Sequence, residues 1–219
     1  MQKPMIETKA VLSLDCHHQI EIETIVAPVE FSFFSRPVTN TVPNRVMTIV
    51  EAYQYIRSNR YQPQTALLRS ITDKNIARNY KARNLDYVCF AGVFSKRCDA
   101  GLILHSGLLT LDFDHVSNLQ ELKSTLLCDL FLETILLFKS PSGDGLKAIV
   151  SIDIERGSHL QWFISISNYI RETYQLKVDP TGKDVSRCCF LPHDPDVFIH
   201  PDLFTQFSNP LHSKNHESN

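Results

Sequence analysis

Hydrophobic and polar residues alternate with two different periods along the first hundred residues. Period-two alternation of β-forming residues predicts strands, and apolar residues three or four positions apart predict helices. Thr48 stands just before one helical pattern and is suited to cap that helix. The expected strands are Gln19–Ile25, Val29–Phe34, Tyr87–Phe94 and Leu102–His105, and the expected helices are Thr48–Ser58, Thr65–Ser70 and Thr72–Arg83. This part of the chain therefore combines strands with a group of short helices.

The second half has a regular order of elements. Gly107–Asp114 predicts a strand that is either separate from Leu102–His105 or continuous with it through a bend at Gly107. The strands expected after it are Thr134–Lys139, Leu146–Ile152, Lys177–Val178 and Cys188–Leu191, and the helices are Ser117–Leu130 and Ser158–Tyr174. The order β-α-β-β-α-β is typical of the split βαβ, ferredoxin-like arrangement. Two helices then cover one face of a four-stranded antiparallel sheet, and the other face is free for ligands or for the N-terminal module.

These patterns predict an α+β protein with three parts. We expect an N-terminal αβ module over residues 1–105 that packs on the core, an RRM-like core over residues 106–205, and a disordered polar tail over residues 206–219. The chain has no run of eighteen apolar residues and no basic–apolar leader, so neither a membrane span nor secretion is expected. Six cysteines without a C-x-x-C pair favour free thiols in a reducing compartment, which indicates the cytoplasm.

Charge is distributed unevenly, although the net charge is only −2. Residues 45–100 contain ten Lys and Arg against four Asp and Glu, whereas residues 101–219 contain nine against fifteen. Such asymmetry predicts a basic element, able to contact phosphates, beside an acidic one. The candidates for nucleic-acid contact are three residues on one helical face and two in a turn: Lys74, Arg78, Lys81, Lys96 and Arg97. A simple solvated helix face explains the first three equally well.

Two acids end the apolar strand that precedes residue 115. Asp112 and Asp114 are separated by one residue, so both carboxylates point to the same side of a strand. Like charges this close are unfavourable unless a cation lies between them, and oxygen ligands suit Mg²⁺ or Mn²⁺. The alternative is an exposed strand end that carries two acids by chance.

Two further segments carry groups suited to phosphates and metals. The loop after the next strand contains Ser140, Ser142, Gly143 and Gly145 and is followed by Lys147, so its amides, hydroxyls and ammonium predict an anion site. An ordinary hairpin turn is the alternative, and the sequence is not a P-loop. Downstream, Asp179 supplies a third acid, or caps a turn, and Arg187 can reach a triphosphate. Together these are the groups that two-metal phosphoryl transfer requires.

The order of these motifs resembles the archaeo-eukaryotic primase superfamily, and in particular the primase-like N-terminal domain of virulence-associated protein E-type proteins of mobile elements. The resemblance covers about residues 30–205. It is carried by KARNLDYVCFAGVFSKR (81–97), SGLLTLDFDH (106–115), SPSGDGLKAIV (140–150) and DPTGKDVSRCCFLPHDPD (179–196). It implies a primase or primer-extending polymerase that joins nucleotides on a single-stranded DNA template in mobile-element or phage-like replication.

The resemblance also implies roles for individual residues. Asp112, Asp114 and Asp179 would be catalytic and bind Mg²⁺ or Mn²⁺. The Gly-rich loop with Lys147 and Arg187 would bind the phosphates of a nucleoside triphosphate. Related proteins often carry a P-loop helicase, so a separate helicase is an expected partner.

One position departs from the superfamily's pattern. The second motif usually ends in histidine, and this chain has Lys147 there. Lysine keeps a positive charge near phosphates but is not a neutral imidazole at neutral pH. His115 is a candidate substitute, although a histidine just past a strand is more often a surface residue. An inactive module that binds single-stranded DNA or an origin is therefore the alternative, and a metal-dependent nuclease is a third possibility.

Overall fold

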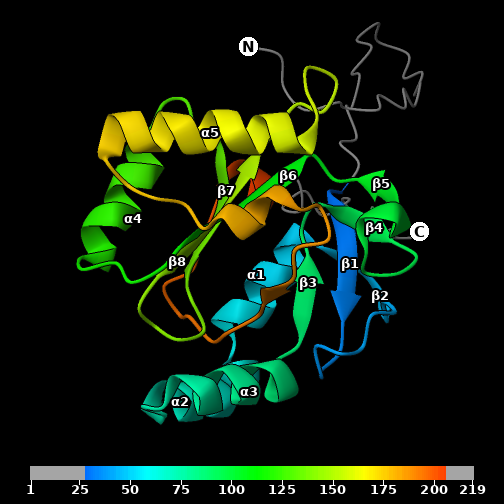
Figure 1. The fold of residues 1–219 in the computed structure, drawn as a ribbon, viewed down its shortest axis with the longest axis vertical. Helices are drawn as coiled ribbons and strands as arrows, with labels where there is room; N and C mark the ends of the chain where they lie inside the picture. The colour runs from blue at the N-terminus through cyan, green and yellow to red at the C-terminus, as the bar shows by residue number, and fades with distance from the viewer. Residues whose placement is uncertain (1–27, 206–219) are drawn as a thin grey trace, which may run out of the picture.

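The computed structural model describes residues 28–205, and the predicted strand Gln19–Ile25 and tail 206–219 lie outside this range. Within it the chain is a mixed α+β protein with antiparallel sheets, which confirms the predicted class (Figure 1). The strands are β1 (Glu30–Phe34), β2 (Arg45–Thr48), β3 (Tyr87–Cys89), β4 (Gly92–Phe94), β5 (Leu102–His105), β6 (Leu108–Phe113), β7 (Thr134–Lys139), β8 (Leu146–Ser151), β9 (Cys189–Phe190) and β10 (Phe198–Ile199). The helices are α1 (Ile49–Arg57), α2 (Gln62–Ser70), α3 (Lys74–Asn84), α4 (Leu119–Cys128), α5 (His159–Tyr174) and α6 (Asp202–Thr205), with 3₁₀ turns η1 (Asn59–Tyr61), η2 (Asp99–Gly101) and η3 (Pro180–Lys183).

The first sheet has the strand order β2-β1-β3-β9, and all of its pairings are antiparallel. Thr48 caps α1 as expected, and it forms a capping box with Glu51. The predicted strand Tyr87–Phe94 is wrong as a single element. β3 pairs with β1 and β9, whereas β4 pairs with β5, because the chain turns at residues 90–91.

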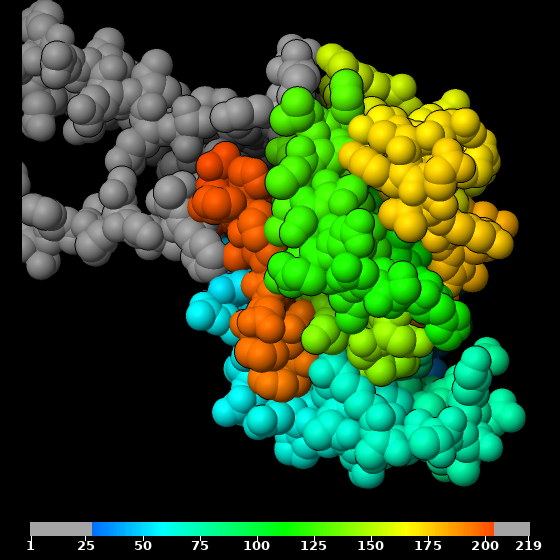
Figure 2. Space-filling view, turned by 90° about the vertical axis from the view of Figure 1, so that its left-hand side faces the viewer, coloured from blue at the N-terminus to red at the C-terminus, as the bar shows by residue number. Residues whose placement is uncertain are grey.

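The second sheet has the order β10-β7-β8-β6 and is also antiparallel. α4 and α5 lie on one of its faces, where Leu111, Phe113, Leu122 and Phe163 belong to one buried cluster. In Figure 1, α5 crosses the top of the sheet, and Figure 2 shows α2 and α3 at the opposite end of the molecule. Gly107, with φ of 75°, separates β5 from β6, so these are two strands.

The other face of the second sheet packs against the first sheet and α1. Leu108, Leu136 and Ile149 share a buried cluster with Phe31 of β1 and Ile56 of α1. Side chains alternate along a strand, so the face that carries Leu108 also carries residues 110 and 112. The end of β6 therefore presents its polar residues between the two halves of the fold.

Of the two strands predicted near the C-terminus, one is wrong and one is confirmed. Lys177–Val178 is not a strand, because Pro180 cannot donate a ladder hydrogen bond and the chain enters η3. Asp179 nevertheless lies beside β6, since its amide donates to the Asp112 carbonyl at 2.9 Å. The strand predicted at Cys188–Leu191 is β9, and it pairs with β3 in the first sheet.

Smaller differences concern element boundaries. The helix predicted over Ser117–Leu130 is the shorter α4, and Asn118 caps it, because the Asn118 side chain accepts the Glu121 amide. β2 and β10 were not predicted, and both are short. All cysteines in the described part of the chain are free. Across residues 28–205, no helix has both the length and the apolar character needed to cross a membrane.

Candidate metal and phosphate site

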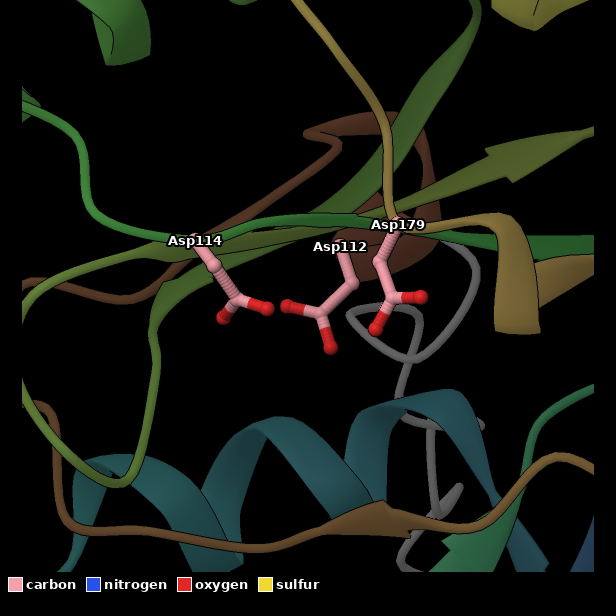
Figure 3. Close-up of side chains that lie close together, drawn as sticks. All are labelled: Asp112, Asp114 and Asp179. Carbon is pink, nitrogen blue, oxygen red and sulfur yellow. The ribbon is translucent and has the colours of Figure 1, made fainter. Parts of the chain in front are cut away.

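Three carboxylates converge at the end of β6. Asp112 lies in the strand, Asp114 follows it, and Asp179 precedes η3; one oxygen from each lies within 4.8 Å of the others. Figure 3 shows the three side chains on the same side of the ribbon. Exposure increases from Asp112, which is buried, through Asp179 to Asp114, which is exposed. The three acids could hold a metal ion with one side open to solvent.

The two oxygens of Asp112 have different surroundings. Lys147, directly opposite in the β6–β8 register, donates its ammonium to Asp112 Oδ2. Asp112 Oδ1 is buried and has no hydrogen-bond partner among the described residues. A buried carboxylate oxygen without a donor is unfavourable, so this oxygen is suited to a cation.

Arg187 links two of the acids. Its Nη2 atom lies 3.2 Å from Asp179 Oδ2 and 3.5 Å from Asp112 Oδ2. Lys147 is only 7% exposed. Burial alone would lower the pKa of its ammonium, but Cys189 and Asp112 nearby raise it, so Lys147 is held protonated. The predicted phosphate-binding residues Lys147 and Arg187 therefore lie at the acids.

The pKa values of Asp114 and Asp179 are shifted in opposite directions. Asp114 is exposed at the surface, but neighbouring protein groups partly desolvate its carboxylate. This desolvation, and then the nearby Asp112, raise the pKa of Asp114 above its ordinary value. Burial opposes ionisation of Asp179 as well, but hydrogen bonds from the Thr181 amide and hydroxyl, together with Arg187, lower its pKa overall. A cation bound at Asp114 would favour the charged form of this carboxylate.

Lys81 differs in its surroundings from the other predicted basic residues on α3. It is half-buried, and its ammonium lies 5.7 Å from the centre of the Phe190 ring. Burial, with Lys147 close by, lowers the pKa of Lys81, whereas Asp112 and Asp114 oppose this shift. Lys81 of α3 is thus close enough to the acids to interact with them electrostatically.

The remaining predicted nucleic-acid contacts lie elsewhere. Lys74, Arg78 and Lys96 are exposed. Arg97 packs over the Tyr87 ring at 5.3 Å and donates to the Tyr87 hydroxyl and the Val38 carbonyl, both at 3.0 Å. The first three form part of the surface, and Arg97 stabilises the first sheet.

The Gly-rich loop adjoins the acids. The Ser140 amide donates to the Gly145 carbonyl at 2.8 Å, and the Gly143 amide donates to the Ser140 carbonyl at 3.0 Å. A Cβ atom on Gly145 would lie 2.2 Å from the Phe113 carbonyl oxygen, so the loop backs directly onto the end of β6. Ser142 is exposed at the tip, and the buried Ser140 hydroxyl has no hydrogen-bond partner among the described residues. The predicted loop residues thus stand beside the carboxylates.

Arg69 of α2 is a residue of this site that the sequence did not reveal. Its guanidinium donates to the Ser140 carbonyl at 3.2 Å and to the Pro141 carbonyl at 3.3 Å. Burial lowers the pKa of Arg69, and the nearby Asp194 opposes that shift. Arg69 lies 71 residues before Ser140, so no local pattern connects them. Its position in the basic 45–100 segment was the only available signal.

His115, the candidate substitute for a motif histidine, pairs with the loop instead. Its Nδ1 lies 2.7 Å from Asp144 Oδ2, and both side chains are exposed. The left-handed backbone of His115, with φ of 56°, turns the chain out of β6. This contact ties the Gly-rich loop to the segment that follows the acids.

Comparison with known proteins identifies a family for this arrangement. The family described as BT4734-like, N-terminal domain, matches residues 80–198, which is more than half of the chain. The chain belongs to the BT4734-like N-terminal domain family. No curated protein and no solved structure matches the chain. The BT4734-like region spans all three acids, the Gly-rich loop and Arg187, whereas Arg69 lies before it.

Proposed function

We propose that this chain is a primase-like nucleotidyltransferase of the archaeo-eukaryotic primase superfamily, close to the virulence-associated protein E-type domains. It uses a divalent metal to join nucleotides on a single-stranded DNA template in mobile-element or phage-like replication. The observation that carries the proposal is the set of carboxylates of Asp112, Asp114 and Asp179, with oxygens within 4.8 Å, beside the cations Lys147 and Arg187.

The residues fit Mg²⁺ or Mn²⁺. All donors are carboxylate oxygens, which these hard cations prefer, and the buried Asp112 Oδ1 has no donor among the described residues. A divalent ion held here would supply positive charge to stabilise phosphate oxygens and to make a hydroxyl group more acidic. Asp112, Asp114 and Asp179 would hold it, with no side-chain nucleophile required.

The surrounding groups suit a triphosphate. Lys147 and Arg187 place two positive charges at the acids, Lys81 adds a third from α3, and the Gly-rich loop lies against the end of β6. The order β6-α4-β7-β8-α5, followed by the segment at Asp179 beside β6, supports a split βαβ core of the primase type.

A primer-synthesis assay tests the proposal. The full chain, a single-stranded template and labelled NTPs or dNTPs are incubated with Mg²⁺ or Mn²⁺, and products are separated by length. We expect metal-dependent incorporation that Asp112→Asn and Asp114→Asn both abolish, whereas Asp196→Asn, an exposed acid outside the site, leaves it unchanged. Incorporation that survives in the Asp112→Asn protein would exclude the assigned centre.

A second candidate is an inactive primase-like module that binds single-stranded DNA or an origin. The ion pair between Lys147 and Asp112 favours it, because this lysine neutralises one metal-binding oxygen. Binding to a single-stranded oligonucleotide is then measured against salt. We expect the log–log slope to become shallower by about 0.7 for each phosphate contact removed in Lys74→Ala and Arg78→Ala.

The two candidates separate in one comparison. Salt-dependent binding together with no incorporation, even when Mn²⁺ replaces Mg²⁺, supports the module. Incorporation that depends on Asp112 supports the enzyme. A slope that does not change in the Lys74→Ala/Arg78→Ala protein removes α3 from the DNA surface.

A further inference from the structure

Two histidines form a hydrogen-bonded pair at the start of β6, away from the acids. His105 Nε2 and His159 Nδ1 lie 3.1 Å apart, although the residues are 54 positions apart in the sequence. His105 ends β5, and His159 begins α5 and is only 7% exposed. Neither residue has a role in the proposed chemistry, so their pairing requires another explanation.

The outer nitrogens of the pair bind two backbone groups on different segments. The Gly107 amide donates to His105 Nδ1 at 3.0 Å, so this nitrogen is an acceptor. His159 Nε2 lies 3.2 Å from the Gly182 carbonyl, which can only accept, so this nitrogen donates. These two constraints determine the remaining contact: His105 Nε2 donates to His159 Nδ1. Both imidazoles are therefore neutral, and all four nitrogens are used.

The chain of hydrogen bonds connects the two segments that carry the acids. Gly107 precedes β6, which leads to Asp112 and Asp114, and Gly182 lies in η3, which follows Asp179. At the other end, the Asp179 amide donates to the Asp112 carbonyl at 2.9 Å. The two segments are thus joined at both ends, which determines where Asp179 lies along β6.

Gly182 is also confined by packing. A Cβ atom there would lie 2.7 Å from the Thr110 carbonyl oxygen and 2.8 Å from the Phe163 ring. The η3 turn therefore lies against the middle of β6 with no space for a side chain. His159, at the start of α5, donates a hydrogen bond to the carbonyl oxygen of Gly182.

We propose that His159, supported by His105, is a positioning residue that holds η3 against β6 and thereby places Asp179 for divalent-cation binding. This inference rests on the proposed metal site. The two histidines contact none of the three carboxylates. Their effect on Asp179 passes through the hydrogen bond to the Gly182 carbonyl and the backbone that joins Gly182 to Asp179. In other proteins, removing a group that bonds a metal ligand directly lowers metal affinity about 10- to 100-fold, and the contact of His159 is one step further from the ligand.

The surroundings keep the pair neutral. Burial, followed by the adjacent His159, lowers the pKa of His105 to about 4. Burial also lowers the pKa of His159, although the Gly182 carbonyl, Asp99 and Asp184 oppose the shift. Asp99, Lys183 and Asp184 are the charged groups that border the cleft, of about 590 Å³, at the pair.

Hydrogen exchange of the metal-free full chain tests the positioning directly. We compare wild type with His159→Leu, which removes both hydrogen bonds, and with His159→Gln, whose amide retains a donor and an acceptor. His200→Leu, at a partly exposed histidine outside the site, is the matched control. We expect faster exchange of amides 179–187 in the His159→Leu protein, with wild-type rates in the other two. Unchanged exchange in the His159→Leu protein would overturn the inference.

Mn²⁺ titration, followed by electron paramagnetic resonance of the free ion, completes the test. We expect the affinity of the His159→Leu protein to fall about 10-fold, the lower end of the range for direct partners of a ligand, and that of the His159→Gln protein to remain close to wild type. An unchanged Mn²⁺ affinity in the His159→Leu protein overturns the positioning role alone. Wild-type protein that binds no Mn²⁺, or an Asp112→Asn protein that binds it equally well, overturns the proposed metal site, and with it this inference.

Discussion

The two ends of β6 are both polar, but they are organised in opposite ways. At its start, His105 and His159 form a neutral chain in which every ring nitrogen has a partner. At its end lie the carboxyl groups of Asp112 and Asp114, and the Oδ1 atom of Asp112 has no hydrogen-bond partner among the described residues. The first end is complete without a ligand, whereas the second is not.

This difference indicates which end of β6 is suited to bind a ligand. A buried polar network that is fully satisfied makes a structure rigid, and one that is incomplete is unfavourable unless something else binds. Lys147 and Arg187 compensate part of the charge at the acids but leave one buried oxygen open. The predictions below test each end in turn.

The largest effect is expected from Lys147→Met. It leaves the carboxylate of Asp112 buried without its main counter-charge, and breaking such a pair typically costs about 3–5 kcal/mol. Urea denaturation at neutral pH measures the loss. Because a divalent cation can replace the ammonium, we expect saturating Mn²⁺ to recover a large part of it.

Two variants control this result. Lys147→Met/Asp112→Leu replaces the pair by apolar side chains and should recover most of the stability, since buried pairs are often no better than well-packed apolar residues. Lys177→Met, at an exposed lysine, should change stability by less than about 0.5 kcal/mol. A Lys147→Met protein as stable as the Lys177→Met protein would show that the charged end of β6 needs no counter-charge.

Gly182→Ala tests the contact of η3 with the middle of β6. Its Cβ atom would collide with the Thr110 carbonyl oxygen and the Phe163 ring, so we expect a loss of about 1–3 kcal/mol in thermal or urea unfolding. Gly157→Ala is the matched control, because its Cβ atom would make only ordinary contacts, with Trp162 at 3.5 Å. Equal stability of the two proteins would contradict the close approach.

Local patterns in the sequence were sufficient for the long elements and for the acids. The capped helix after Thr48 and the strand Thr134–Lys139 are observed as expected, because each is defined by neighbouring residues. The D-x-D spacing was enough to place Asp112 and Asp114 on one side of a strand. Their proximity to Asp179 depended on a predicted strand that is absent, and a single backbone hydrogen bond brings Asp179 there instead.

What sequence could not reveal depends on contacts between distant segments. A strand at Cys188–Leu191 was predicted, but its pairing with β3 about one hundred residues earlier was not, because a local pattern does not say which strands pair. The contact of Arg69 with Ser140 and that of His105 with His159 arise only when α2 and α5 pack on the sheet. Lys81 was grouped with Lys74 and Arg78 by helical spacing, but its burial near the acids sets it apart.

The neutral end should respond to pH. The pKa of His105 is lowered to about 4 from an ordinary 6.5, so between these values the unfolded chain binds a proton that the folded chain does not. Stability is therefore expected to fall as the pH falls from 6.5 toward 4, by about 1 kcal/mol per pH unit for this group. His105→Gln should reduce the slope between pH 6.5 and 5, measured by urea denaturation. An identical slope in wild type and variant would show that the pair is not held neutral.

The smallest effect is expected just beyond the charged end, at His115. His115 and Asp144 lie within ion-pair distance of each other, as Lys147 and Asp112 do. The two pairs differ in burial, since the His115 side chain is 73% exposed. Exposed pairs contribute about 0–1 kcal/mol, and asparagine tolerates the left-handed backbone at this position. We therefore expect His115→Asn to change the free energy of unfolding by less than about 0.5 kcal/mol at pH 6 and at pH 8. A loss as large as that of Lys147→Met would mean that exposure does not separate the two pairs, and the contrast between buried and exposed charge at this end of β6 would have to be given up.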